Sequence, residues 1–282
     1  MGLLIPVTLN HLASLNSNYY IPTELCFNNI IHSIWQVEGS PSFQKELIIP
    51  KGVVEVIFNF SGSCPIPSQL GNVQYHLPNC FINGFNKAPI QTLLPKQQAF
   101  FGILFQPLAV KKIFKTPAGE FSDITVDLTL LNPIFHSLWH QLAEQENFTS
   151  RVNIFLLWLR KNFIDWEPRE QLINNFLYAV NQHDLSAGAL ANSLCYSPRH
   201  LSRKLLEATG MNTEQILLYK KYLHAVALIH NANLSLTAIA YQSHFSDQSH
   251  FIKTFKDFTT ITPGEYKRNR SYVKGHIYQD VR

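Results

Sequence analysis

The sequence predicts an α+β fold in which a small β-sandwich or barrel-like sheet with helices precedes an all-α domain of two helix-turn-helix units joined by a long helix. Short runs of β-branched and aromatic residues, separated by Pro, Gly and Asn, predict strands before residue 106. From residue 171 onward strand signals vanish and apolar residues recur at helical spacing. The helical part also repeats itself after about fifty residues, which indicates a duplicated motif.

Length and composition favour a folded chain with two domains. The chain has 282 residues, of which 46% are hydrophobic and 15% are charged. This balance excludes a disordered chain, because disorder needs low hydrophobicity and high charge. Domains hold roughly 100–200 residues, so the length favours two of them. We place them at residues 1–168 and 169–282, where the composition changes.

The net charge of +4 is unevenly distributed along the chain. Residues 1–170 hold 11 basic and 12 acidic residues, whereas residues 171–282 hold 12 basic and 7 acidic residues. The first part is therefore nearly neutral, and the second has a net charge of +5. This asymmetry indicates a polyanionic partner for the second part, although a solvated basic surface explains the charge equally well.

The cysteine pattern and the lack of targeting signals predict a cytoplasmic protein. Cys26, Cys64, Cys80 and Cys195 form no C-x-x-C pair, so we expect free thiols in a reducing compartment. The first residues lack a basic region and soon meet Pro6, which is unlike a signal peptide. No apolar run approaches the ~20 residues that cross a membrane, so we expect no membrane association.

The N-terminal part is expected to hold short strands and then helices. Residues 47–60 are rich in β-branched and aromatic residues and contain Pro50-Lys51-Gly52, which predicts a turn that leads into a strand. Similar strand signals lie at residues 80–82, 90–94 and 99–105. After Pro107 the spacing becomes helical, at residues 108–114, 138–144 and 151–161.

Start and stop signals divide the C-terminal part into helices. The apolar face of its first helix is expected to hold Leu172, Phe176, Leu177 and Val180. Ser186, Ser235 and Asp247 are N-cap candidates, because their side-chain oxygens accept amides of the first turn. Pro198 and Pro263 suit first helical positions, and Gly210 suits a helix end. Residues 213–230 predict a helix about 27 Å long.

The repeat consists of two copies of a short helix, a tight turn and a second helix, which is the helix-turn-helix pattern. The matching segments are Ala189-Leu190-Ala191 with Ala238-Ile239-Ala240, Tyr196-Ser197 with Phe245-Ser246, and His200-Leu201-Ser202-Arg203 with His250-Phe251-Ile252-Lys253. In this motif the second helix enters the major groove of DNA. Joined by a helix of about 27 Å, the two units suit major grooves about one turn, ~34 Å, apart on one face of a duplex. Helix pairs that merely stack remain the alternative.

Several longer segments identify a family. They are Leu236-Thr237-Ala238-Ile239-Ala240, Phe245-Ser246-Asp247-Gln248-Ser249-His250-Phe251, Phe255-Lys256 and Ile261-Thr262-Pro263-Gly264-Glu265-Tyr266-Lys267-Arg268. With them, residues 185–268 resemble the double helix-turn-helix DNA-binding domain of the AraC family of bacterial transcription regulators. More loosely, residues 48–60 and 101–127, including Gly102-Ile103-Leu104-Phe105-Gln106-Pro107, resemble an N-terminal sensor region of some members.

The resemblance implies which residues read DNA. In the first reading helix, residues 197–207, the base-reading candidates are Arg199, Ser202 and Arg203. In the second, residues 247–258, they are Gln248, Ser249, His250, Ile252 and Lys253. Arg suits guanine and Gln suits adenine, so these types fit base recognition. The candidates for phosphate contacts are Thr237, Lys220, Lys221, Lys256, Lys267 and Arg268.

The sequence departs from the family at three positions that usually hold glycine. Cys195 and His244 occupy the turns of the two units, and Thr260 precedes the last Thr-Pro pair. Where the backbone there needs a positive φ, each non-glycine residue costs up to about 1–2 kcal/mol. Ile252 and Lys253 stand where polar and arginine residues are common, so we expect an altered DNA specificity.

Nothing in the sequence indicates an enzyme, a metal or a cofactor. His136 and His140 lie one helical turn apart, a spacing that can bind zinc, but no carboxylate interrupts them and Trp139 indicates packing. No phosphate loop, nucleophile elbow or dinucleotide fingerprint is present. We therefore predict no catalytic residue, no metal ligand and no cofactor.

A short pattern in the N-terminal part indicates an effector pocket. Alternation along residues 53–60 places Glu55 and Asn59 on one strand face, where they would supply polar groups to a pocket. Phe101 and Phe105, with Phe100, are the aromatic candidates for its wall. Ordinary core packing of these aromatics is the alternative.

Together these observations imply a sequence-specific DNA-binding transcription regulator, an activator by resemblance, with an N-terminal domain for effector sensing or dimerisation. The implied partners are double-stranded DNA, RNA polymerase, a small-molecule effector and a second copy of the chain. Two alternatives stay open. One is a helical protein-interaction module, and the other is a metal-binding β-domain enzyme fused to a DNA-binding domain.

Overall fold

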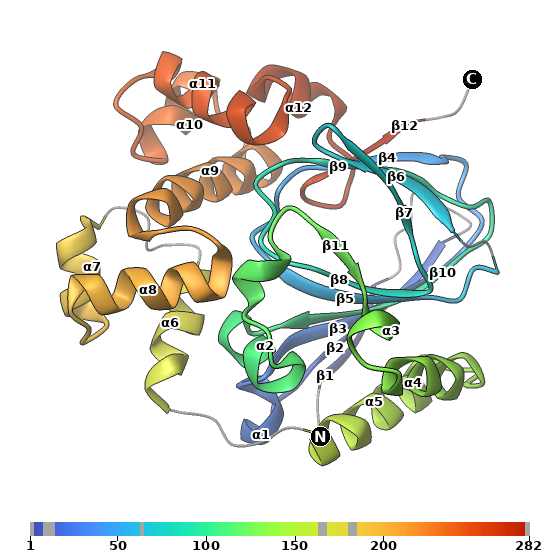
Figure 1. The fold of residues 1–282 in the computed structure, drawn as a ribbon. Helices are drawn as coiled ribbons and strands as arrows, with labels where there is room; N and C mark the ends of the chain where they lie inside the picture. The colour runs from blue at the N-terminus through green and yellow to red at the C-terminus, as the bar shows by residue number, and fades with distance from the viewer. Residues whose placement is uncertain (1–2, 8–14, 63–64, 163–167, 180–184, 280–282) are drawn as a thin grey trace.

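The computed structural model describes residues 3–7, 15–62, 65–162, 168–179 and 185–279 (Figure 1). Two antiparallel sheets in the N-terminal part face each other, and helices flank them (Figure 1). The fold class expected from the sequence is thereby confirmed. The predictions for Cys64 and Val180 lie outside the described residues, and the predicted domain boundary adjoins residues 163–167, which are also outside them.

The larger sheet has seven strands, and each pairs antiparallel with its neighbour. In spatial order they are β1 (Leu3–Val7), β2 (Leu15–Ile21), β3 (Ile31–Gly39), β10 (Gln98–Phe105), β5 (Val54–Asn59), β8 (Cys80–Asn83) and β11 (Thr125–Asp127). The strand signals at residues 53–60, 80–82 and 99–105 are confirmed as β5, β8 and β10. Strands β2 and β3 had no clear signal, because polar residues interrupt both.

The second sheet has five strands and includes the last element of the chain. Its order is β12 (His276–Gln279), β4 (Lys45–Ile48), β9 (Ile90–Leu93), β6 (Ile66–Leu70) and β7 (Val73–Leu77). β12 pairs with β4, with His276 opposite Ile48 and Gln279 opposite Lys45. The expectation that no strand follows residue 171 is therefore wrong. A four-residue strand is too short to show periodicity, and only its partner in the N-terminal sheet fixes it.

Helices of the N-terminal part cover the outer face of the seven-stranded sheet (Figure 1). They are α1 (Leu25–Asn28), α2 (Pro107–Phe114), the 3₁₀ helix η1 (Ala118–Phe121), α3 (Leu128–Leu131), α4 (Ile134–Ala143) and α5 (Phe148–Asn162). Phe101 of β10 packs its ring against Phe148 and Phe155 of α5, with centroids 6.1 and 6.5 Å apart. This face of the sheet is therefore the main hydrophobic core.

Within the described part of the chain, seven helices follow in the C-terminal part, and the predicted N-caps are confirmed. They are α6 (Pro168–Tyr178), α7 (Ala187–Ser193), α8 (Pro198–Thr209), α9 (Thr213–Asn231), α10 (Leu236–Gln242), α11 (Gln248–Thr259) and α12 (Pro263–Asn269). Ser186, Ser235 and Asp247 each accept a first-turn amide as N-caps. Gly210 ends α8 with a φ of +70°. On α6, Leu172 is exposed, and Ile173 takes the buried position expected for it.

Candidate nucleic-acid interface and inner cavity

The first helix-turn-helix unit, α7 and α8, buries its apolar face and exposes the polar start of α8. Leu201 and Leu205 are fully buried, whereas Arg199 and Arg203 are exposed on the opposite side. Ser202 is half-buried beside them. The amphipathic spacing thus places both arginines where they can reach a partner in solution.

The second unit, α10 and α11, follows the same plan. Phe251 and Phe255 are fully buried, and the predicted reading residues Gln248, Ser249, His250 and Lys253 are exposed, whereas Ile252 is half-buried. The Thr237 hydroxyl donates to Gln248 Oε1 over 2.8 Å and holds that amide in one orientation. Ser246 Oγ lies 3.0 Å from His250 Nδ1. Local hydrogen bonds therefore pre-orient two of the reading side chains.

The backbone is left-handed in both turns and at the end of α11, the three positions where the family usually has glycine. φ is +57° at Cys195, +58° at His244 and +64° at Thr260. The expectation of a left-handed backbone at these positions is confirmed. A side chain there is strained, most of all at Thr260, because it is β-branched.

Thr260→Gly is expected to raise the free energy of unfolding by roughly 0.5–1 kcal/mol. Glycine relieves about 1–2 kcal/mol of left-handed strain but loses more chain entropy on folding. Urea denaturation measures the change. Lys256→Gly, at an exposed position inside α11, is the control and should lower the same free energy by about 1 kcal/mol. A lower midpoint for Thr260→Gly would contradict the assignment of strain.

The phosphate candidates differ in how available they are. Lys256, Thr237 and Arg268 are exposed. Lys267 and Lys221 are half-buried and donate to backbone carbonyls, over 2.6 Å to Leu234 and 2.8 Å to His244 respectively. Those two lysines tie neighbouring segments of the second unit together in addition to any contact with a partner.

Lys220 does not belong to this surface, and its assignment to phosphate is corrected. Its side chain is 4% exposed, and Nζ donates to the carbonyls of Phe176, Leu177 and Ala179 at the end of α6. Burial lowers the pKa of Lys220 to about 8. A lysine at a helix C-terminus satisfies carbonyls that have no partner in the helix, so its role is structural.

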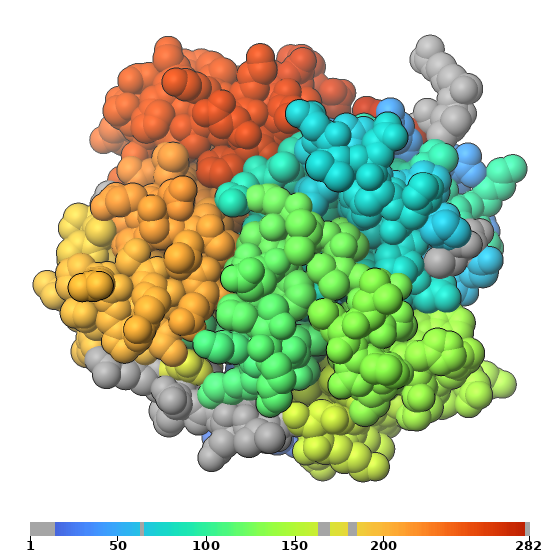
Figure 2. Space-filling model, viewed as in Figure 1, coloured from blue at the N-terminus to red at the C-terminus, as the bar shows by residue number. Residues whose placement is uncertain are grey.

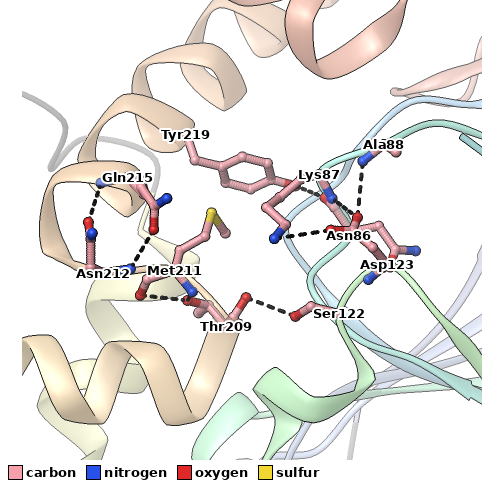
Figure 3. Close-up of polar contacts among 10 residues, drawn as sticks. All are labelled: Asn86, Lys87, Ala88, Ser122, Asp123, Thr209, Met211, Asn212, Gln215 and Tyr219. Carbon is pink, nitrogen blue, oxygen red and sulfur yellow. Dashed lines mark hydrogen bonds and ion pairs between the residues drawn. The ribbon is translucent and has the colours of Figure 1, made fainter.

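The N-terminal part contacts the first unit and α9 through a set of hydrogen bonds that the sequence did not reveal (Figure 3). Tyr219 of α9 donates to the carbonyl of Asn86 over 2.9 Å, and Ser122 donates to the carbonyl of Thr209 over 2.9 Å. Asp123 Oδ1 accepts the backbone amide of Lys87 over 2.6 Å and so fixes the loop that Tyr219 contacts. In Figure 2 the C-terminal helices, orange and red, lie directly against the N-terminal part.

Glu170 of α6 joins the same contact by bridging two lysines. It lies 3.2 Å from Lys112 Nζ of α2 and 2.8 Å from Lys204 Nζ of α8. Burial acts to raise the pKa of Glu170, but the hydrogen bonds and charges of Lys204 and Lys112 outweigh burial and hold it below its ordinary value of 4.5. The three residues link the first reading helix to α2.

Glu170→Gln is expected to destabilise the protein at pH 7 and to have little effect in acid. Since the folded pKa is lowered, the carboxylate stabilises the fold above pH 4.5, and this contribution is lost as the pH falls through the folded value. Urea denaturation of both proteins between pH 3 and pH 7 tests the prediction. Glu207→Gln is the control, because its contact with Lys111 is more exposed. A difference that does not depend on pH would contradict the ion-pair role.

A cavity of about 740 Å³ lies between the two sheets and extends to α9 and to the segment after α12. Glu55 lines it, as the sequence predicts. Phe101 and Phe105 do not, because they point from β10 into the hydrophobic core, and Asn59 instead holds the backbone amide of Ser61. Those three assignments are corrected. The alternate residues of β10, Phe100 and Leu104, face the cavity, as period-two strands require.

The cavity is closed by residues from both ends of the chain. Tyr272, Lys274 and His276 line it together with strands β2, β3 and β5. His276 Nδ1 lies 2.6 Å from Glu46 Oε1 of β4, and the ring of Tyr278 stacks on Phe43 at 3.8 Å. The C-terminal segment, residues 271–279, thus covers a space that the two sheets leave open.

Within the described residues, no three His, Cys, Asp or Glu side chains gather closely enough to hold a metal ion. His136 and His140 are exposed neighbours on α4, with ring centroids 4.6 Å apart. Among the helices described, none is both long and apolar enough to cross a membrane. Cys26, Cys80 and Cys195 form no disulfide, and burial raises the pKa of the Cys80 thiol to about 12.

Comparison with known proteins finds similarity mainly in the C-terminal part. A family model described as a helix-turn-helix domain matches residues 190–269, and a domain of unknown function (DUF6597) matches residues 20–127. The chain is similar to the HTH-type transcriptional activator RhaS of Escherichia coli O1:K1 / APEC, with 28% identity over 125 residues. That alignment covers 44% of this chain and only 38% of the relative.

Solved structures give more distant likenesses. ToxT from Vibrio cholerae, in its P21 form, is 14% identical with a TM-score of 0.44, covering 90% of this chain and 98% of that chain. The C-terminal domain of the response regulator yesN from Fusobacterium nucleatum is 27% identical with a TM-score of 0.31. The second likeness covers 35% of this chain and 96% of that chain.

Proposed function

We propose that this chain, which carries an AraC-type helix-turn-helix domain at residues 190–269, is a sequence-specific DNA-binding transcription regulator. One observation carries the proposal. Two helix-turn-helix units each bury an apolar face and expose polar side chains at the start of the second helix, with two arginines in the first unit and one lysine in the second. That is the end which reaches base edges in the major groove.

The proposed base-reading residues fall into two groups joined by α9. Arg199, Ser202 and Arg203 belong to α8, and Gln248, Ser249, His250 and Lys253 belong to α11. A helix of 19 residues spans about 28 Å, which suits two major grooves one turn apart. Thr237, Lys221, Lys256, Lys267 and Arg268 are the proposed phosphate contacts.

Arg203→Ala is expected to weaken binding to the cognate site by about 1–3 kcal/mol, because a guanine loses its bidentate partner. The site is first obtained by mapping the bound sites across the genome, and its affinity is then measured by fluorescence anisotropy. Arg160→Ala removes the same charge on α5, at a distant exposed position, and is the control. An affinity that Arg203→Ala leaves unchanged would show that α8 is not a reading helix.

Salt dependence separates DNA recognition from a protein-interaction module. Each phosphate contact should lower log K by ~0.9 per unit of log salt. The four cationic contacts, Lys221, Lys256, Lys267 and Arg268, would give a steep slope, and each of them removed should reduce it by about one contact. A DNA affinity that does not depend on salt would favour the protein-interaction alternative.

The cavity is the proposed effector site, and its position suggests how a ligand would act. Leu223 and Ala227 of α9, the helix that joins the two units, line it together with Glu55. A bound molecule would therefore contact the element that sets the spacing of the reading helices. We further propose that the protein acts in the cytoplasm as an activator that recruits RNA polymerase, and that a second copy of the chain takes part. Reporter transcription with and without the protein tests the activator role.

A further inference from the structure

We propose that the inner cavity takes an organic cation with a flat aromatic body, such as a protonated aromatic amine. The inference rests on the proposed effector role of the cavity and names the chemical class of its ligand. Three features of the cavity carry it: an aromatic wall held in one orientation, a buried carboxylate beside that wall, and the engagement of the Lys220 ammonium group by carbonyls of α6.

The wall is the indole of Trp35, which the sheet fixes in place. Trp35 of β3 lies opposite Gly102 of β10, and a Cβ at Gly102 would come within 2.1 Å of the indole. The indole therefore occupies the space that any side chain at 102 would fill. Its Nε1 donates to Glu55 Oε1 over 2.7 Å, which fixes the rotation of the ring. A flat, pre-oriented aromatic surface lines the cavity as a result.

Other aromatic rings extend this wall. Tyr19 of β2 pairs with Trp35 across the sheet, and Phe100 and Phe81 line the same cavity. Both phenylalanines belong to the small buried cluster between the sheets, and Trp35 packs against that cluster. Aromatic faces carry negative electrostatic potential and attract cations, with tryptophan the strongest. The cavity thus favours a flat, positively charged ligand.

Glu55 supplies the negative charge at this wall. The side chain of Glu55 is 8% exposed, and Oε1 already accepts the hydrogen bond from Trp35. Oε2 lies 3.5 Å from Lys51 Nζ, a long contact with a lysine that remains 26% exposed at its side chain. Burial and the charge of Glu55 both raise the pKa of Tyr19, in keeping with negative potential in this space. A ligand cation can take the place of Lys51 beside Oε2, because Lys51 can turn to solvent.

The other charged groups of the cavity have hydrogen-bond partners of their own or lie at its rim. The ammonium group of Lys220 donates hydrogen bonds to three backbone carbonyls at the end of α6. Glu46, the second carboxylate, is engaged by His276. Lys274 is exposed at the rim. Anion binding at Lys51 is the opposite outcome, and the experiment is designed to detect it.

The test is calorimetric titration of the full-length protein with two probes of equal shape. The probes are 2-naphthylmethylammonium and 2-naphthoate, which share an aromatic body and differ in charge. We expect the cation to bind about tenfold more tightly, since an enclosed cation–aromatic contact and one carboxylate favour it. Equal affinity, tighter binding of naphthoate, or no binding of either probe would overturn the proposal.

Two variants at one ion pair give opposite predictions. Glu55→Gln keeps an acceptor for the Trp35 indole but removes the charge, so the cation should bind about tenfold more weakly and naphthoate no more weakly than before. Lys51→Gln removes the competitor and should strengthen cation binding. Lys51 is partly exposed, so this variant is expected to fold. Weaker cation binding by Lys51→Gln would overturn the proposal even where Glu55→Gln proves unstable.

DNA affinity, measured separately, distinguishes failure of this inference from failure of the proposed function. Salt-dependent DNA binding without cation binding would leave the regulator in place and remove only the ligand class. Cation binding without DNA binding would leave the cavity assignment in place and remove the regulator.

Discussion

Replacing Gly119 by alanine is expected to lower the free energy of unfolding by about 1–3 kcal/mol, the usual cost of overpacking. Gly119 lies in η1, where the N-terminal part touches the end of α8. A Cβ there would lie 2.4 Å from the carbonyl oxygen of Leu206 and 2.8 Å from the amide nitrogen of Gly210. Both are backbone atoms, so no side chain can turn away and η1 must separate from α8.

The separation should also change DNA recognition, because α8 is the proposed first reading helix. Movement of η1 would break the hydrogen bond from Ser122 to the carbonyl of Thr209 and alter how α8 sits against the N-terminal part. Urea denaturation and DNA affinity measure the two effects. Gly188→Ala is the matched control, since nothing lies within 4 Å of its added Cβ and alanine favours the helix. A Gly119 variant as stable as this control would contradict the close approach.

Local features of the helical part could be predicted because each depends on only a few neighbouring residues. Ser186 and Asp247 cap helices through their own side chains, and this chemistry is legible in sequence. The positive φ at Cys195 and His244 could be predicted from the resemblance to a family that usually carries glycine at these turns. The signal there was a departure from an expected glycine rather than a residue type.

The sequence predicts which strands line the cavity, but it does not predict which side chains of β10 face it. Alternation placed Glu55 correctly, but it could not show which face of β10 meets the core. The aromatic side chains on both faces of β10 are buried, so Phe100 and Phe101 look alike in sequence although they point in opposite directions. A shift of one residue moves a side chain to the other face of the strand. Phe101 and Phe105 lie on the same face of β10, so both assignments to the pocket were wrong.

Contacts between segments that are distant in the sequence could not be predicted from local residue patterns. Lys220 resembles a surface lysine in a helix, and only the end of α6 beside it shows that it is buried. Likewise Trp35 gains its role from Gly102 and Glu55, which lie on other strands. Both cases depend on tertiary packing, which periodicity and composition do not encode.

Deletion of residues 271–282 is expected to lower the free energy of unfolding by roughly 2–4 kcal/mol. The segment buries Ile277, worth about 1.5–3 kcal/mol, and stacks Tyr278 on Phe43, worth about 0.5–1.5 kcal/mol. It also pairs β12 with β4. The matched control ends at Gln279 and keeps β12 complete, so a loss that only the longer deletion shows belongs to residues 271–279. Urea denaturation of the three proteins measures the difference.

The same deletion should loosen the geometry of DNA recognition, because the two units are held in different ways. The first unit is held against the N-terminal part by η1 and Glu170. The second continues into the C-terminal segment, where the amide of Gly275 donates to Tyr266 of α12 and its carbonyl accepts from Ile49. Without that connection the second unit loses these two hydrogen bonds and depends more strongly on its link through α9. We therefore expect the deletion variant, unlike the control, to tolerate one base pair inserted between the two halves of the site. Equal discrimination by both proteins would show that α9 alone fixes the spacing.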